Sequence, residues 1–122
     1  MPRARNVKIP ECMPLILSII DDLGKGRALS RVYLALWCQK SRQDVVILSD
    51  EKQMAFSAGM VGQRSERTWR SYLQELAQLG FVKIDETTVT ILDPIKALKG
   101  LAANGTIGIH PAKYKRAINI DR

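Results

Sequence analysis

The sequence predicts a single, mainly helical domain that also contains a small β-hairpin. The chain has 122 residues, which is the size of one ordinary domain. Apolar residues recur at helical spacing through most of its length. Two short β-branched runs, 81–84 and 89–92, are separated by four polar residues, as the strands of a hairpin would be.

The composition indicates an ordinary globular protein with an excess of positive charge. Apolar residues make up 46% and charged residues 25% of the chain, a balance typical of domains that can bury a core. Lys and Arg number 19 against 12 Asp and Glu, which gives a formal net charge of +7. Such an excess favours a polyanionic partner, and nucleic acid is the commonest one.

Most enzyme, metal-binding and membrane classes are not expected. The apolar runs of the chain, among them 13–17, are too short to span a bilayer, and the chain does not open with a secretory signal pattern. Cys12 and Cys38 have neither a metal-binding spacing nor a disulfide framework, so we expect buried thiols in a reduced, cytoplasmic setting. His110 is the one histidine and is expected at the surface. Because no hydrolase, zinc-protease, CxxC or phosphate-loop motif occurs, we expect no catalysis, no metal site and no cofactor.

The first part of the chain predicts a basic arm, two helices and a short strand. Residues 1–10 are polar and contain two prolines, as a flexible arm does. An apolar helix is expected over 13–23, and a second helix runs from Ser30, its expected N-cap, to about residue 39. The β-branched run 45–48 predicts a strand. The expected buried face of the second helix contains Val32, Ala35, Leu36 and Cys38, with Tyr33 and Trp37 beside it.

Two capped helices separated by a short turn are expected next. Ser49 is the expected N-cap of a helix that reaches Val61 and is ended by Gly62, with the turn at 62–64. Ser65 is the expected N-cap of a longer helix that ends at Leu79, before a glycine. Buried positions are predicted at Met54, Ala55, Ala58, Met60 and Val61, and in the longer helix at Trp69, Tyr72, Leu73, Leu76 and Leu79.

The last part of the chain predicts the hairpin, one further helix and a basic tail. Residues 85–88 join the two strands, and Pro94 fits the first turn of a helix that Asn104-Gly105 ends near residue 103. The expected organisation is a flexible basic arm (1–10), a folded unit with flanking helices (11–104) and a basic tail (105–122). The tail contains a short helix at about 111–118.

The order of elements from residue 29 is helix, strand, helix, turn, helix and hairpin. The longer helix opens with SERTW (65–69) and continues through YLQEL (72–76) into LGFV (79–82). This pattern resembles the winged helix-turn-helix family of DNA-binding proteins, in particular bacterial transcriptional regulators and plasmid replication and maintenance proteins. The resemblance covers about half of the chain. It implies a winged helix with extra N- and C-terminal helices, a positioning helix over 49–61, a recognition helix over 65–79 and a wing over 81–92.

A recognition helix of this kind enters the major groove of duplex DNA. Arg67 and Arg70 can form bidentate contacts to guanine, and Gln74 suits adenine. Arg64 and Lys52 are expected to contact phosphates, which position a protein without reading sequence. The complete set of expected DNA-binding residues is Lys52, Gln63, Arg64, Ser65, Arg67, Thr68, Arg70, Ser71, Gln74, Lys83, Arg3, Arg5, Lys113, Lys115 and Arg116.

The hairpin departs from the family pattern at its tip. Many family members carry Arg or Lys there, whereas this chain has Asp85 and Glu86, which repel phosphate. Lys83 is the one cation of the hairpin. Contacts to the DNA backbone are therefore expected from the basic arm and the basic tail, since flexible basic segments can reach an adjacent groove.

Two apolar stripes lie outside the predicted motif. Helix 13–23 is apolar on two sides, and the helix after the hairpin carries a stripe at Ile95, Leu98, Leu101 and Ala102. Both stripes favour a homodimer that would set two recognition helices about 34 Å apart on a palindromic site. Alternatively, both stripes close over the motif within one chain.

The sequence thus predicts a sequence-specific double-stranded DNA-binding protein. It would act as a transcriptional regulator, or as a plasmid replication or partition factor that works with a second protein. The alternative is a winged helix that serves as a protein-interaction module, with the acidic wing as its contact. In that alternative Arg67 and Arg70 are solvated and replaceable.

Overall fold

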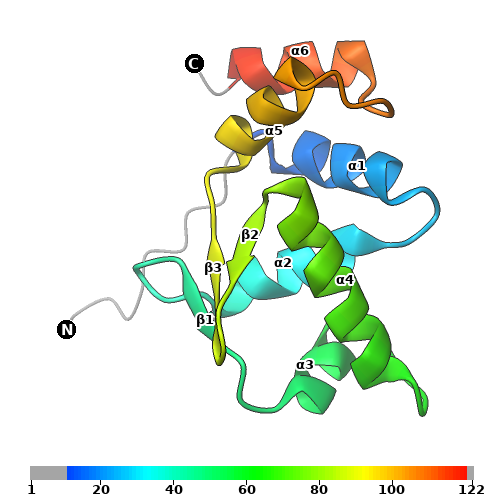
Figure 1. Ribbon diagram of the computed structural model, residues 1–122, viewed down its shortest axis with the longest axis vertical. Coiled ribbons are helices and arrows are strands. Elements are labelled where there is room, and N and C mark those ends of the chain that lie inside the picture. Colours follow the sequence, from blue (N-terminus) through cyan, green and yellow to red (C-terminus); the bar gives the residue numbers. More distant parts are fainter. Residues whose placement is uncertain (1–10, 121–122) are drawn as a thin grey trace.

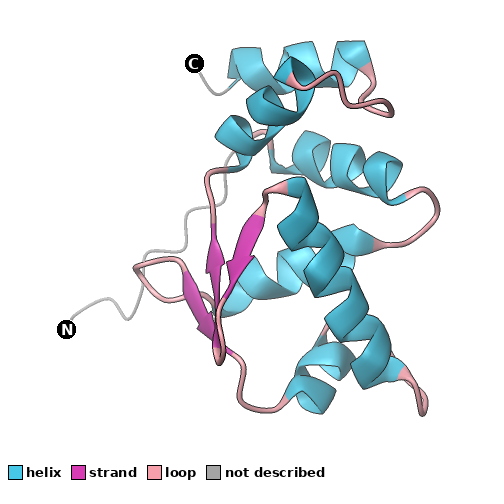
Figure 2. Cartoon of the chain, in the orientation of Figure 1, coloured by secondary structure: helices cyan, strands magenta, loops and turns pink. Residues whose placement is uncertain are grey.

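The computed structural model describes residues 11–120, and this part of the chain is mainly helical with one small sheet (Figures 1 and 2). The mainly helical class predicted from the sequence is confirmed. In chain order the elements are α1 (Met13–Gly24), α2 (Leu29–Gln39), β1 (Val45–Ile47), α3 (Glu51–Ser57), α4 (Ser65–Leu79), β2 (Val82–Ile84), β3 (Thr88–Ile91), α5 (Pro94–Ala103) and α6 (Pro111–Ile120). The expected arm at residues 1–10 lies outside the described residues.

The sheet has three antiparallel strands in the order β1-β3-β2. Val46 lies opposite Val89, and Val82 lies opposite Ile91. These four apolar side chains are buried, whereas Lys83 between them is exposed, which is the alternation of a sheet with one covered face. The Asp85 amide donates to the Thr88 carbonyl at 2.8 Å and closes the β2–β3 hairpin. The predicted hairpin and the strand before it are both present, and the strand pairs with the hairpin.

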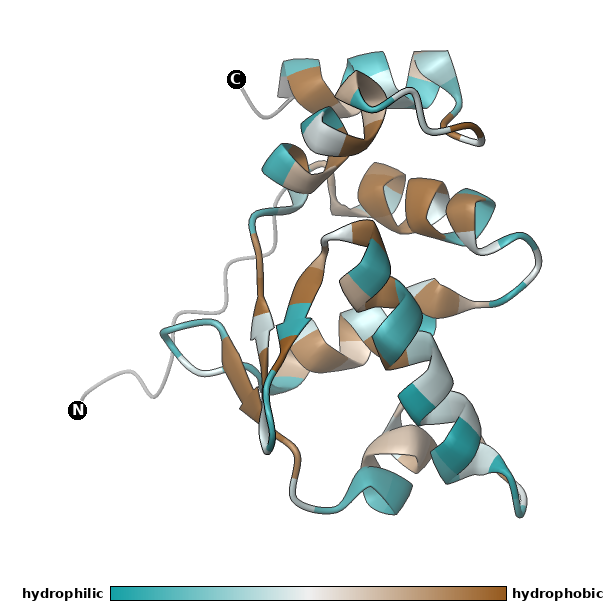
Figure 3. Cartoon of the chain, viewed as in Figure 1, coloured by the Kyte–Doolittle hydropathy of each residue, from teal (hydrophilic) through white to brown (hydrophobic). Residues whose placement is uncertain are grey.

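One continuous core connects the helices and the sheet. Tyr33, Trp69 and Phe81 are fully buried, and the ring of Tyr33 meets those of Phe81 and Trp37 edge to face. The predicted apolar face of α4 is buried at Trp69, Leu73 and Leu76, and Met54 and Met60 are buried as expected. In Figure 3 the apolar residues dominate α1, whereas α4 is coloured mostly hydrophilic on its visible side.

The three predicted serine caps are not confirmed. Ser30 lies inside α2, where its amide and hydroxyl both donate to the carboxylate of Asp21 from α1. Asp50, not Ser49, caps α3, because its side chain accepts the Gln53 amide at 3.1 Å. Ser65 is the first residue of α4 and makes no side-chain cap.

The third helix ends earlier than predicted. Gly59 adopts a positive φ of +87°, and the Met60 amide donates back to the Ala55 carbonyl, which is the hydrogen bond of a glycine-terminated helix end. Helix α3 therefore stops at Ser57, and the connection to α4 is longer than the expected turn at 62–64. Val61 was predicted to be buried, but it lies in this connection with an exposed fraction of 75%.

Cys38 was also predicted to be buried, and it is exposed, whereas Cys12 is buried. Arg31, Leu34 and Cys38 are exposed on α2 and share one face at helical spacing. Cys38 therefore belongs to the face opposite the buried one, at the edge of a pocket of about 260 Å³ between α2 and α3.

The two apolar stripes are largely covered within the chain. Helix α1 packs against α2 and α6, and Ile95 and Leu98 of α5 are buried, while Ala102 stays exposed. The segment expected as a basic tail contains α6, which begins at the predicted residue and extends to Ile120. Its Ala117 is fully buried, so this helix belongs to the core. Between residues 11 and 120, no helix combines the length and the apolar character that crossing a membrane requires.

Candidate nucleic-acid interface

Helix α4 presents an open polar face along its length. Arg67, Ser71, Gln74 and Gln78 are all exposed, and their spacing of four, three and four residues places them on one side of a helix. The opposite side is buried in the core through Trp69, Leu73 and Leu76. The buried side fixes the rotation of the helix, so the polar side faces solvent.

Two ion pairs hold the flanks of α4. The Arg70 guanidinium lies 2.5 Å from Oε2 of Glu51 on α3. The carboxylate of Glu75 lies 2.7 Å from the guanidinium of Arg27, which precedes α2. These pairs join α4 to the two neighbouring elements and leave the Arg67 face between them uncovered.

The two arginines predicted to read guanine have different surroundings. Arg70 is engaged with Glu51, and 39% of its side chain is exposed. Arg67 is exposed, and its guanidinium has neither an ion pair nor a hydrogen bond to any residue between 11 and 120. Only Arg67 therefore has its full set of donors available for an external acceptor.

The start of α4 gathers several of the other predicted residues. Gln63 and Arg64 are exposed in the connection that precedes the helix, and Lys52 is exposed on α3, which packs against α4. Thr68 is half-buried, and Ser65 is buried with an exposed fraction of 8%. Ser65 thus contributes to packing, and its side chain is the least accessible of the predicted contacts on this helix.

The remaining predicted residues lie elsewhere. Lys83 is exposed on β2, in a hairpin whose tip carries the exposed Asp85 and Glu86. Lys113, Lys115 and Arg116 all lie on α6, at the opposite end of the molecule from the start of α4 (Figure 1). Arg3 and Arg5 lie outside the described residues. The structure therefore brings together the α3–α4 residues and separates them from the C-terminal cations.

Sequence reasoning missed the exposed apolar residues beside this interface. Phe56 on α3 is 62% exposed and Val61 in the following connection is 75% exposed. The signal that could have found them is Gly59, because a glycine at a helix end predicts that the apolar pattern stops there.

The buried hydroxyl of Tyr33 lies outside the interface. Burial raises the pKa of the Tyr33 hydroxyl well above its usual range, and the nearby carboxylates of Asp93 and Asp44 act in the same direction. Its hydroxyl has no hydrogen-bond partner among the described residues. Over the same residues, no three His, Cys, Asp or Glu side chains are grouped so that they could hold a metal ion.

Comparison of the chain with protein-family models, with curated proteins and with solved structures finds no match in any of the three.

Proposed function

We propose that this protein binds double-stranded DNA in a sequence-specific manner, with α4 as the helix that enters the major groove. The order α2, β1, α3, α4, β2, β3 is the order of elements in a winged helix-turn-helix domain, and this agreement supports the proposal. In this reading α3 is the positioning helix and the β2–β3 hairpin is the wing. The protein would act in the cytoplasm as a transcriptional regulator, or as a plasmid replication or partition factor.

The open polar face of α4, with Arg67 free at its N-terminal end, is the observation that carries the proposal. At 1.5 Å per residue, a helix of this length extends about 22 Å, and a major groove about 12 Å wide accepts it. A guanidinium without an intramolecular partner can make the bidentate contact to guanine O6 and N7. In this proposal Arg67 is thus the main residue that contacts bases.

The other residues have supporting roles in this proposal. Ser71 and Gln74 follow Arg67 along the same exposed face, where Gln74 suits adenine. Arg64 and Lys52 contact phosphates on either side of the helix start. Arg70 orients α4 through Glu51, because its ion pair links the helix to α3.

The rival proposal is a protein-interaction module built on the same fold. Two observations favour it: Phe56 and Val61 are exposed next to the α3–α4 connection, and Asp85 and Glu86 make the hairpin tip acidic. Exposed apolar residues rimmed by polar ones are common at protein interfaces. This rival does not need a free guanidinium at position 67.

Selection of duplexes from a random pool, at two ionic strengths, tests the proposal against its rival. We expect one recovered motif, arranged as an inverted repeat if the protein acts as a homodimer. Recovery of no motif, with binding lost at the higher ionic strength, would contradict sequence-specific binding. The length of the footprint then separates a regulator, which protects one or two operators, from a partition or replication factor on arrayed repeats.

Substitution of Arg67 provides the residue-level test. We expect Arg67→Ala to weaken binding to the selected motif by about 1–3 kcal/mol and to relax the preference at one base pair. Gln78→Ala removes an exposed side chain from the far end of the same face and is the matched control. Equal affinities of the two variants for the motif would favour the protein-interaction module.

A further inference from the structure

The end of the molecule formed by α5 and α6 carries a second concentration of positive charge. Residues 94–120 contain no Asp or Glu, and their basic residues are Lys96, Lys99, Lys113, Lys115 and Arg116. Lys113 is ion-paired with Asp22 of α1. The other four are exposed and have no ion pair with any residue of the described segment 11–120.

The basic face of α6 is held in a fixed direction. Lys113 Nζ donates to Ser18 Oγ at 2.8 Å and to Asp22 Oδ2 at 2.7 Å, which fastens α6 to α1. Ala117 is buried on the same side, so the helix cannot turn without exposing core surface. The charges of this helix therefore belong to a folded surface.

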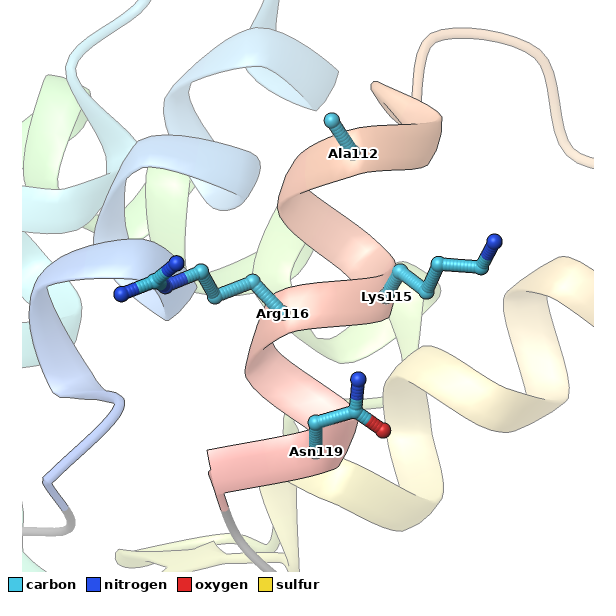
Figure 4. Close-up of a pocket in the computed structure, with 4 residues that line it drawn as sticks. All are labelled: Ala112, Lys115, Arg116 and Asn119. Carbon is cyan, nitrogen blue, oxygen red and sulfur yellow. The ribbon is translucent and has the colours of Figure 1, made fainter.

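The outer face of α6 is suited to a row of anionic groups. Ala112, Lys115, Arg116 and Asn119 share this face at helical spacing and line an open groove of about 490 Å³. In Figure 4 the side chains of Lys115 and Arg116 diverge to the two edges of this face, and the Asn119 amide lies one turn further along the helix. Lys96 and Lys99 are exposed on the neighbouring helix α5. Cations and an amide without a carboxylate among them match phosphates of a nucleic-acid backbone, which are bound through charge and not through base identity.

This α5–α6 surface is separate from the α4 interface. The start of α4 and helix α6 lie at opposite ends of the longest dimension of the molecule (Figure 1). The α4 end is less basic, because residues 50–70 carry four cations (Lys52, Arg64, Arg67, Arg70) against three carboxylates (Asp50, Glu51, Glu66). When α4 lies in the groove of one duplex, the more basic α5–α6 end of the molecule faces away from that duplex.

We propose that the α5–α6 surface binds the phosphate backbone of a second duplex without sequence preference, while α4 reads the first. One chain then bridges two duplex segments. This inference rests on the proposed function, because it takes α4 as the reader of the first duplex. Lys115 and Arg116 are the central contacts, since both line the groove on α6.

An energy-transfer assay with two labelled duplexes tests the bridging. A donor-labelled duplex carries the selected motif and an acceptor-labelled duplex carries an unrelated sequence, with the full-length protein added at one chain per motif duplex. The test variant is Lys115→Gln combined with Arg116→Gln, because glutamine keeps the helix propensity and removes the charges. The control is Lys25→Asn, which removes an exposed cation from the α1–α2 turn at a positive φ of 52° that asparagine tolerates.

We expect the wild-type protein and the Lys25→Asn control to bring the two labels together. The Lys115→Gln/Arg116→Gln variant should keep its affinity for the motif duplex within about twofold and lose bridging by about tenfold or more. Its affinity for the unrelated duplex should depend less steeply on salt, by about two units of slope, since each lost phosphate contact removes about 0.9. Circular dichroism confirms that α6 is folded in the variant.

Several results would overturn the inference and are distinguishable from one another. If the wild-type protein selects a motif but does not bridge, the inference fails and the proposed function stands. If the double variant still bridges, the second duplex is held elsewhere. If the double variant loses affinity for the motif duplex instead, α6 contacts the same duplex as α4. If no motif is selected at all, the proposed function fails and the inference fails with it.

Discussion

Arg67 and Arg70 lie one helical turn apart on α4, and a single neighbour separates their roles. The carboxylate of Glu51 forms an ion pair with Arg70, whereas Arg67 lies on the exposed polar face of α4. Pairs of this exposure are worth little in stability, because solvent screens the charges and holding two long side chains costs entropy. Under the proposed function, Arg70 would help to position α4 through this pair, and Arg67 would contact the bases.

A double-mutant cycle measures this division. We expect Arg70→Ala and Glu51→Ala to show a coupling free energy of about 0.2–1 kcal/mol in denaturant unfolding, while Arg67→Ala shows no coupling to Glu51→Ala. Coupling of equal size at both arginines would show that Glu51 does not distinguish them.

Tyr33 determines a second residue-scale property, the loss of stability in alkali. Burial raises the pKa of its hydroxyl in the folded protein, so the unfolded chain releases this proton at about pH 10, the ordinary value, and the folded chain does not. Ionisation of this hydroxyl therefore stabilises the unfolded state as the pH rises above 10. Stability that is fully present below pH 10 is lost progressively above it.

The Tyr33→Phe variant isolates this contribution. We expect wild type to lose roughly 1–1.5 kcal/mol more than the variant between pH 9 and pH 11, measured as the free energy of unfolding in denaturant. The variant keeps the ring contacts to Trp37 and Phe81 and removes a hydroxyl without a described partner. Parallel pH profiles for the two proteins would contradict the expectation.

At the scale of elements, the start of α2 is completed by a residue from another helix, whereas α3 and α5 are capped by the aspartates that directly precede them. Asp21 of α1 accepts hydrogen bonds from both the amide and the hydroxyl of Ser30, in the first turn of α2. The adjacent Asp22 faces the other way and pairs with Lys113 of α6. Two neighbouring carboxylates thus fasten α1 to two different helices.

Substitution of these aspartates should have unequal effects. We expect Asp21→Ala to lower the free energy of unfolding by about 1–2 kcal/mol, because it leaves the start of α2 without its acceptor. Asp22→Ala serves as the matched control and should cost less than about 1 kcal/mol, since its partner is a surface lysine. Chemical denaturation of both variants checks the order, and a larger loss for Asp22→Ala would reverse the assignment.

At the scale of the whole molecule, one core extends from α1 to α6. Ala117 near the C-terminal end of the described chain belongs to the same buried cluster as Trp37 and Trp69. The basic face of α6 is therefore supported by the same packing that holds α4. The two proposed DNA surfaces therefore lie on elements that share one buried core.

This continuity predicts a single unfolding transition. We expect thermal curves from far-ultraviolet circular dichroism and from tryptophan fluorescence to coincide, as they do in two-state domains of this size. Early loss of part of the helical signal, before the tryptophans become exposed, would show that α6 unfolds independently.

Local sequence signals predicted helix ends correctly where a single glycine determines them. The glycine after Leu79 and the Asn104-Gly105 pair end α4 and α5 as expected, since both glycines adopt positive φ angles that other residues avoid. Prediction failed where two similar residues competed. Gly59 and Gly62 both adopt a positive φ, and Ser49 and Asp50 are both suitable N-caps; the structure uses Gly59 and Asp50.

At the candidate interface, too, the sequence predicted local features but not contacts between distant residues. The pattern of apolar residues on α4 was enough to predict which side is buried and that Arg67, Ser71 and Gln74 share the exposed side. The capture of Arg70 by Glu51 could not be predicted, because those residues are nineteen positions apart and meet only when α3 packs on α4.

By itself, the sequence determined the mainly helical class, the positions of the helices apart from the end of α3, and the amphipathic character of α4, because these depend on short-range spacing and turn chemistry. Only the tertiary structure decided that α6 closes against α1 and that the cations of α3–α4 lie at the opposite end of the described molecule from those of α6. The physical reason is that burial of apolar surface brings together segments that are far apart in the chain. Local sequence patterns do not determine which of these segments packs against a given apolar face.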